Sequence, residues 1–154
     1  MIDENMIEVR GLHKSYGELE VLKGVSLDVK KSEVVCIVGA SGAGKTTLLQ
    51  IIGTLSSSDS GEVKIDGVRT DKLGDRELSH FRNNRIGFVF QFHHLLPEFD
   101  AFEYVCMPGY IGGRDRSAVE SRASELIEML GMTPRIRHKP SQLSGGEQQR
   151  IAIA

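Results

Sequence analysis

A glycine-rich stretch constrains the fold of this chain more than any other feature of its sequence. It reads Gly39-Ala40-Ser41-Gly42-Ala43-Gly44-Lys45-Thr46-Thr47 and matches the pattern GxxxxGKT at every fixed position. The apolar run at residues 33–38 precedes it, and a helix-compatible run at residues 47–52 follows it. A strand, a glycine-rich turn and a helix in this order are the setting of a phosphate-binding loop. A chance match rarely has this setting, which disfavours the alternative of a glycine-rich turn before an ordinary helix.

The residue types in this stretch suit a bound polyphosphate. Glycines let successive backbone N–H groups turn toward an anion, and the first turn of the following helix carries a partial positive charge. Lys45 can reach the outer phosphates, and the Thr46 hydroxyl is a ligand for Mg²⁺. The sequence therefore predicts that residues 39–47 bind the phosphates of a nucleotide.

The bulk composition narrows the class of protein. The 154 residues are 40% hydrophobic and 26% charged, which is ordinary for a soluble globular domain. The net charge of −2, without a basic block, disfavours a dedicated nucleic-acid surface. The acidic N-terminus lacks a signal-peptide pattern, and no apolar run approaches the roughly 20 residues that span a bilayer. We expect a cytoplasmic protein in which Cys36 and Cys106 are buried thiols.

Hydrophobic periodicity predicts several strands. Residues 7–14 and 25–29 alternate apolar and polar side chains, which is typical of half-buried antiparallel strands. Residues 34–38 and 86–90 are apolar on both faces, as in central parallel strands covered by helices. Residues 62–68 contain an Asp-Gly turn and predict a short hairpin.

Helices are expected over residues 47–52, 75–83 and 117–130, and from residue 145 onward. The last two follow the capping-box pattern Ser-x-x-Glu, in Ser117 with Glu120 and in Ser144 with Glu147. The final helix has two glycines in its first turn, which is unfavourable for a helix but useful for close approach to an anion. One phosphate loop already serves a nucleotide in the same chain, so we hypothesise that this second helix start completes a neighbour's site.

Three other positions each admit two interpretations. Tyr16 is either a strand-end aromatic that covers the core or a flat ring that stacks on a purine. Gln91 follows an expected strand and is either a metal or water contact or an ordinary surface residue, since ligands collect at the carboxyl ends of parallel strands. The apolar run at residues 92–99 either packs within its own domain or docks another protein.

Together these motifs resemble the nucleotide-binding subunits of ABC transporters, from about residue 7 to residue 154. Residues 39–47 resemble the Walker A loop, Gln91 the glutamine of the Q-loop, and the run LSGGE at residues 143–147 the signature motif. Tyr16 is similar to the aromatic residue that stacks on adenine. The chain departs from the family at Glu147, where many members have Gln, and at Ser32, where relatives usually have Gly.

The resemblance implies an α/β fold, the ABC-type P-loop NTPase, with a mixed sheet, antiparallel N-terminal strands and a helical subdomain. It implies one ATP-binding domain over residues 1–154, with the core at residues 1–90 and the Q-loop, helical subdomain and signature at residues 91–154. The implied ligands are ATP and Mg²⁺, with the metal at Thr46 and Gln91. The residues expected to bind ATP are Tyr16, Gly39, Ala40, Ser41, Gly42, Ala43, Gly44, Lys45, Thr46, Thr47 and Gln91.

The resemblance also implies partners and a location. The family forms head-to-tail dimers in which each ATP lies between one subunit's Walker A loop and the other's signature. The expected signature residues are Ser144, Gly145, Gly146 and Glu147. Within the family, residues 90–99 resemble the ATPase subunits of lipoprotein-releasing complexes, with macrolide-export relatives next. We therefore expect a homodimer on the inner face of the cell membrane that contacts integral membrane permease subunits through the region Phe92–Phe102.

One expected part of the family's site has no counterpart before Ala154. The Walker B strand, with an Asp that orders Mg²⁺ and a Glu that polarises water, and the switch His normally follow the signature helix. We therefore expect a C-terminally incomplete domain, an ATPase as the parent protein, and little turnover by this chain alone because the catalytic carboxylate is absent. The alternatives are a nucleotide-binding module without turnover and a soluble ABC ATPase that acts on nucleic acid or the ribosome.

Overall fold

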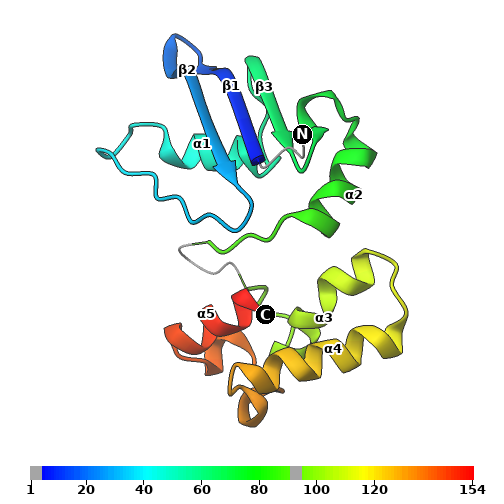
Figure 1. The fold of residues 1–154 in the computed structure, drawn as a ribbon. Helices are drawn as coiled ribbons and strands as arrows, with labels where there is room; N and C mark the ends of the chain where they lie inside the picture. The colour runs from blue at the N-terminus through cyan, green and yellow to red at the C-terminus, as the bar shows by residue number, and fades with distance from the viewer. Residues whose placement is uncertain (1–4, 91–94) are drawn as a thin grey trace. The chain divides into compact units, whose positions relative to one another are not determined.

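The computed structural model of the chain describes residues 5–90 and 95–154. The chain divides into two compact units, Met1–Arg82 and Asn83–Ala154. Figure 1 shows that the first unit contains a sheet and that the second is helical. No helix among the described residues is long and apolar enough to cross a membrane.

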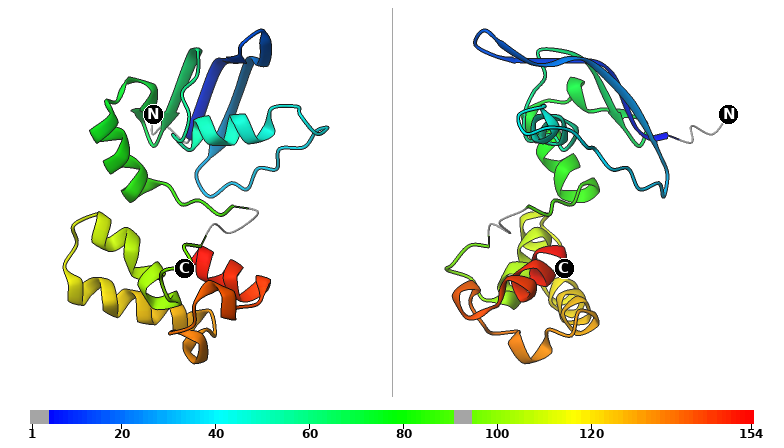
Figure 2. Two further views of the ribbon diagram at one scale, coloured as in Figure 1. Left: turned by 180° about the vertical axis from the view of Figure 1, so that it is seen from behind. Right: turned by 90° about the vertical axis from the view of Figure 1, so that its left-hand side faces the viewer.

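The first unit is built on a four-stranded sheet in the order β2-β1-β3-β4. Its strands are β1 (Asn5–Tyr16), β2 (Leu19–Lys30), β3 (Ser60–Ile65) and β4 (Val68–Arg69), and neighbouring strands pair antiparallel. The antiparallel strand predicted at residues 7–14 is confirmed, but its regular alternation is not: the fully buried Val9 and Leu12 lie three residues apart, with a register shift between them. Figure 2 shows helix α1 (Lys45–Ile52) against one face of this sheet.

The hairpin of β3 and β4 is confirmed, with the predicted Asp-Gly pair at its turn. Asp66 and Gly67 have φ values of 47° and 78°, and an Asp-Gly pair tolerates this left-handed conformation. Beyond β4 the chain forms a short 3₁₀ helix, η1 (Thr70–Lys72), and then helix α2 (Asp75–Arg85).

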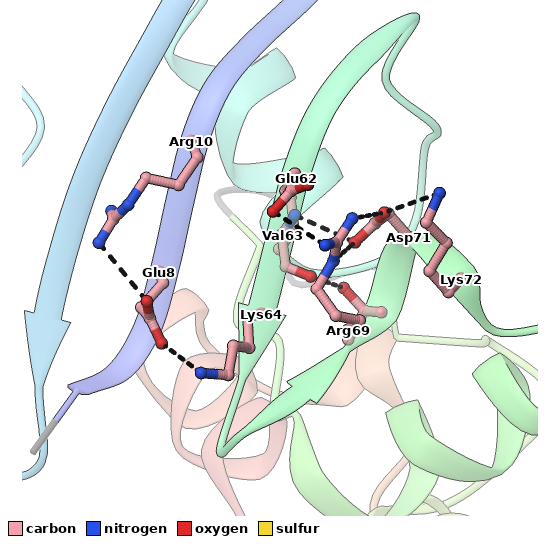
Figure 3. Close-up of polar contacts among 9 residues, drawn as sticks. Glu8, Arg10, Glu62, Val63, Lys64, Arg69, Asp71 and Lys72 are labelled. Carbon is pink, nitrogen blue, oxygen red and sulfur yellow. Dashed lines mark hydrogen bonds and ion pairs between the residues drawn. The ribbon is translucent and has the colours of Figure 1, made fainter. Parts of the chain in front are cut away.

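A cluster of ion pairs joins this hairpin to η1 (Figure 3). The Arg69 guanidinium donates to both carboxylate oxygens of Asp71, at 2.8 and 2.7 Å, and lies 2.8 Å from Glu62. The backbone N–H of Val63 also donates to Asp71, at 3.3 Å. The hydrogen bonds from Arg69 hold the pKa of Asp71 below its ordinary value because they stabilise the ionised carboxylate.

The second unit is organised around helices α3 (Ala101–Ile111), α4 (Arg116–Met129) and α5 (Gly145–Ile153). Two 3₁₀ helices, η2 (Thr133–Arg135) and η3 (Pro140–Gln142), lie between α4 and α5 in sequence. Its core is formed by apolar residues from several of these regions: Ala101, Ile127, Met132, Leu143 and Ile151. A second cluster contains Cys106, Val119 and Ala123.

Two predicted strands are not strands in the structure. Residues 34–38 and 86–90 have no regular structure. Val34 and Val38 are 96% and 83% exposed, and Val89 is 54% exposed. A strand that is apolar on both faces needs hydrogen-bonded neighbours and covering helices, and none of the described strands pairs with either segment.

The predicted environments of the two cysteines have different outcomes. Cys106 is buried in the second unit, as predicted. The prediction for Cys36 was wrong, since this thiol is exposed. Its burial depended on the strand expected at residues 34–38, and without neighbouring strands that segment lies at the surface.

Candidate nucleotide-binding site

The glycine-rich stretch lies in the connection between β2 and α1. Gly44 immediately precedes α1 and has a φ of 84°, which a glycine adopts without strain. A β-carbon at this position would lie 3.0 Å from side-chain atoms of both Leu22 and Val21, and 3.1 Å from the Val21 carbonyl oxygen. Glycine therefore lets the helix begin close against β2, while Leu48 and Ile51 bury the inner face of α1.

The start of α1 is suited to an anion. No side chain accepts a hydrogen bond from its first turn, and no acidic residue lies there. The other α-helices with described caps, α3, α4 and α5, begin with an acceptor from Asp100, Asp115 and Ser144. The N–H groups of the first turn and the helix dipole thus leave a positive end at α1 that a phosphate group satisfies.

Lys45 closes the loop on itself. Its ammonium group donates hydrogen bonds to the carbonyl oxygens of Gly39, at 2.9 Å, and Ala40, at 2.6 Å. This arrangement holds a positive charge over the turn formed by the preceding residues. Phosphate oxygens carry a negative charge and are stronger acceptors than carbonyl oxygens. The Lys45 ammonium group can therefore exchange these carbonyl contacts for hydrogen bonds to a bound phosphate.

The Thr46 hydroxyl is the described group that would ligate Mg²⁺. Thr46 is exposed, directly after Lys45. Within residues 5–90 and 95–154, no group of three or more His, Cys, Asp or Glu side chains is placed to hold a metal ion.

Tyr16 lies at the end of β1, in the same unit as the loop. Its side chain is 52% exposed, and the Lys14 ammonium lies 5.5 Å from the ring centroid. Lys14 also pairs with Asp59, at 3.0 Å. The described contacts do not join Tyr16 to the glycine-rich loop. Stacking of the Tyr16 ring on a purine therefore stays a prediction.

Gln91 lies outside the described residues, together with residues 92–94 of the expected docking region. The described part of that region has two kinds of residue. Leu95 and Phe102 pack against the core of the second unit. Leu96 and Phe99 are 45% and 37% exposed. The segment therefore both packs within its own unit and presents apolar side chains at the surface.

The signature-like residues begin helix α5 in the second unit. Both halves of the predicted capping box are present: the Glu147 N–H donates to the Ser144 hydroxyl at 3.4 Å, and the Ser144 N–H donates to the Glu147 carboxylate at 2.7 Å. Gly145 is exposed, and a β-carbon on it would meet nothing within 4 Å. The first turn of α5 is thus open to close approach from outside.

Arg135 is a residue at this helix start that the sequence motifs do not identify. Its guanidinium donates to the Glu147 carboxylate at 3.1 Å, on the oxygen that Ser144 does not use. The hydrogen bond from the Ser144 backbone, followed by smaller contributions that include Arg135, lowers the pKa of the Glu147 carboxyl. The signal in the sequence is Glu147 itself, since an acidic side chain in a motif predicted to face an anion favours a cation nearby.

The first unit also contains a cavity of ≈ 490 Å³ away from the predicted residues. It is lined by segments that include the end of α1, η1 and α2, among them Thr54, Thr70 and Arg82. Arg82 donates to the Thr54 carbonyl oxygen at 2.6 Å, which fixes α2 against the residues after α1. None of the described residues expected to bind ATP lines this cavity.

Comparison with known proteins agrees with the motifs. A family model described as ABC transporter matches residues 22–154. The lipoprotein-releasing system ATP-binding protein LolD of Bacteroides thetaiotaomicron is 54% identical over 149 residues, covering 97% of this chain and 68% of the relative. LolD of Porphyromonas gingivalis gives the same identity and coverage. LolD of Geobacter metallireducens is 52% identical over 154 residues, covering 97% of this chain and 68% of the relative.

Solved structures show the same relationship. The ATP-binding cassette MJ0796, described as a dimer in a post-hydrolysis state bound to ADP and Pi, superposes with a TM-score of 0.87 at 42% identity. The match covers 96% of this chain and 67% of that structure. Another dimeric structure of MJ0796, described as a bacterial ABC transporter cassette, gives the same values. The predicted fold class, an ABC-type P-loop NTPase, is thereby confirmed.

Proposed function

Because the chain belongs to the ABC transporter family, as an ATP-binding subunit, we propose that it uses ATP binding and hydrolysis to drive the release of lipoproteins from a membrane. The proposal that the chain binds a nucleotide is supported by the loop that Lys45 closes before α1, and by the first turn of α1, whose N–H groups no side chain caps. The lipoprotein part rests on relatives that are 54% identical and are named as ATP-binding proteins of the lipoprotein-releasing system.

Different residues of the loop bind different parts of ATP and its metal ion. Backbone N–H groups around Gly42 and Gly44 and the first turn of α1 bind phosphate oxygens. The Lys45 ammonium neutralises the outer phosphates, where charge develops as the terminal phosphoryl group is transferred to water. The Thr46 hydroxyl and Gln91 would hold Mg²⁺, which would supply positive charge to neutralise the phosphates. Tyr16 stacks on the adenine ring.

The second helix start serves a neighbouring chain in this proposal. Two copies associate head to tail, and the open first turn of α5, at Ser144, Gly145 and Gly146, faces the phosphates bound by the partner's loop. The dimeric state of the similar cassette MJ0796, in a structure bound to ADP and Pi, supports this arrangement. ATP then joins the two subunits, and its hydrolysis separates them.

Coupling to a membrane partner is assigned to the region Phe92–Phe102. Its exposed apolar residues Leu96 and Phe99 offer a contact surface, and Leu95 and Phe102 fix that surface to the core of the second unit. The protein would then lie at the inner face of the membrane by binding permease subunits.

The substitution Lys45→Ala tests this function in the complete protein, assembled with its membrane partners in vesicles that carry a lipoprotein. Loss of the ammonium group should lower the rate of ATP hydrolysis by about a hundredfold or more, because transition-state charge loses its counter-charge. Lipoprotein release should fall in parallel. Released phosphate and released lipoprotein are the two measurements.

The matched control is Lys31→Ala, which removes an exposed lysine from the same β2–α1 connection. It should leave both rates close to those of the unsubstituted protein. Unchanged hydrolysis in Lys45→Ala would refute the phosphate role of the loop. Full ATP-driven hydrolysis without lipoprotein release, but with export of a macrolide from the same vesicles, would refute the cargo assignment and leave the ATPase assignment standing.

A further inference from the structure

The negative charge of Glu147 favours the start of α5 but opposes the approach of a phosphate to the same turn. It belongs to the first turn of α5, where the helix start is open and, under the proposed function, faces the partner's ATP. A carboxylate there stabilises the isolated helix through the dipole and the capping box. It also repels a polyphosphate that approaches the same turn, so the two roles conflict unless the charge is balanced.

Arg135 supplies that balance. Its guanidinium reaches one Glu147 oxygen at 3.1 Å, while the Ser144 N–H occupies the other at 2.7 Å. The Glu147 side chain is 19% exposed and that of Arg135 is 48% exposed, so water screens this pair only in part. Within the described part of the chain, Arg135 is the ion-pair partner found for Glu147.

The buried core of the second unit fixes the positions of Arg135 and Glu147 relative to each other. The Arg135 backbone N–H donates to the carbonyl oxygen of Met132, which is 1% exposed and packs in the same cluster as Leu143 and Ile151. Leu143 precedes the helix start, and Ile151 anchors the buried side of α5. The Arg135 guanidinium also contacts the His138 ring, at 3.2 Å. Both charged groups are therefore attached to one packed cluster.

We propose that Arg135 is a positioning residue for the trans nucleotide site: it neutralises Glu147 so that the start of α5 can approach the partner's phosphates. This inference rests on the proposed function, since it requires that α5 faces ATP. It differs from a purely structural tether between η2 and α5. A tether is lost when either Arg135 or the Glu147 carboxylate is removed, whereas charge balance fails only when Arg135 is removed and Glu147 keeps its charge.

A double-mutant cycle separates the two roles. Arg135→Gln is made in the unsubstituted protein and in a Glu147→Gln background, each as the complete protein, and each is compared with its own parent. The amide introduced by Glu147→Gln keeps an oxygen that accepts the Ser144 N–H but has no charge. The readouts are the ATP concentration at half-maximal hydrolysis, ATP-dependent dimerisation by light scattering, and ATP binding by the monomer.

With Glu147 present, Arg135→Gln should raise the ATP concentration for dimerisation and hydrolysis by about tenfold, the size of one partly screened charge interaction. In the Glu147→Gln background the same substitution should change these values by less than about twofold. ATP binding by the monomer should not respond to Arg135→Gln in either background. Arg122→Gln, which removes an exposed ion pair with Glu125 on α4 at 2.8 Å, is the control and should have no effect.

Equal losses in the two backgrounds would overturn the proposal, because Arg135 would then act independently of the charge at residue 147. A tenfold loss from Glu147→Gln alone would overturn it as well and leave Arg135 as a tether, since that substitution removes the charge together with the contact to Arg135. Ser144→Arg distinguishes this failure from a failure of the proposed function, because it places bulk and charge at the same helix start. If Ser144→Arg blocks ATP-dependent dimerisation and spares monomer binding, the trans site stands whatever the cycle shows. If it leaves dimerisation and hydrolysis intact, the trans site itself is wrong.

Discussion

Because Gly44 has no β-carbon, helix α1 can begin close to strand β2 of the sheet. Gly44 and Gly42 both have positive φ, at 84° and 79°, so the backbone of each is equally unsuited to other residues. Their surroundings differ. A β-carbon at Gly44 would meet Leu22 and Val21 at 3.0 Å, whereas one at Gly42 would meet nothing within 4 Å. These two glycines of the loop, out of three, are therefore needed for different reasons: conformation at Gly42, and both conformation and space at Gly44.

Substituting each glycine by alanine separates these reasons. Gly42→Ala should lower the free energy of unfolding by about 1–2 kcal/mol through the left-handed backbone alone. Gly44→Ala should add about 1–3 kcal/mol for overpacking against β2, since the Val21 carbonyl cannot rotate away. Urea unfolding followed by circular dichroism measures both. Equal urea midpoints for the two variants would show that the start of α1 moves away from β2 without a loss in the free energy of unfolding.

At the scale of the helix, the same sequence pattern gave one correct and one wrong capping box. Ser144 caps α5 as predicted, but α4 begins at Arg116 and its cap is Asp115, which accepts from the Ala118 N–H at 3.0 Å. The glutamate expected to complete the Ser117 box, Glu120, accepts instead from Arg116 at 2.7 Å and from the Tyr110 hydroxyl of α3 at 3.0 Å. The described contacts of the Glu120 carboxylate are therefore with Arg116 of α4 and Tyr110 of α3 rather than with the start of a helix at Ser117.

The cap of α4 is directly testable. Asp115→Ala should reduce the free energy of unfolding of the second unit by about 1 kcal/mol, because it leaves the first-turn N–H groups without a side-chain acceptor. Ser117→Ala is the matched control and should change it by less than about 0.5 kcal/mol. Chemical denaturation of both variants checks the assignment. A larger loss for Ser117→Ala would restore the capping box predicted from the sequence.

Sequence patterns misjudged two kinds of element: segments that need distant partners, and a helix whose periodicity is obscured by its own composition. The hairpin of β3 and β4 was predictable because its turn residues, Asp66 and Gly67, determine it locally. Residues 34–38 carry a strand-like pattern, but hydrogen-bonded neighbours rather than composition make such a segment a strand. Helix α3 was not predicted, although Asp100 and Glu103 form a capping box at its start. Its apolar composition and internal Pro108 obscured the helical pattern.

At the scale of the whole molecule, the same distinction applies to the site. The glycine-rich loop and the start of α5 could be predicted because both are contiguous motifs whose chemistry follows from residue spacing. Arg135 could not, since its role depends on the packing that brings η2 to Glu147, 12 positions along the chain. Sequence motifs thus identify the groups that would contact phosphate, while the groups that adjust their charge become visible only in the folded structure.

Several carboxylates in both units have a lowered pKa, which predicts how the whole chain responds to acid. Hydrogen bonds from Lys14 and Arg69 lower the pKa of Asp59 and Asp71 in the first unit. Arg116 lowers the pKa of Glu120 in the second unit, where that of Glu147 is lowered as well. A carboxyl whose pKa is lower in the folded state stabilises that state above its unfolded pKa. This stability is lost as the pH falls through the folded value.

The free energy of unfolding should therefore be nearly constant from about pH 8 to pH 5.5 and fall steeply below about pH 4, near the unfolded pKa of Asp and Glu. Asp71→Asn removes the most extensively bonded of these groups, so its stability should be lower at pH 7 and should depend less on pH below about 4. Asp75→Asn removes an exposed charge from the same unit and serves as control. Urea midpoints measured at each pH for the three proteins test this expectation. An Asp71→Asn profile parallel to that of the unsubstituted protein would mean that the cluster around Arg69 does not stabilise the fold through the charge of Asp71.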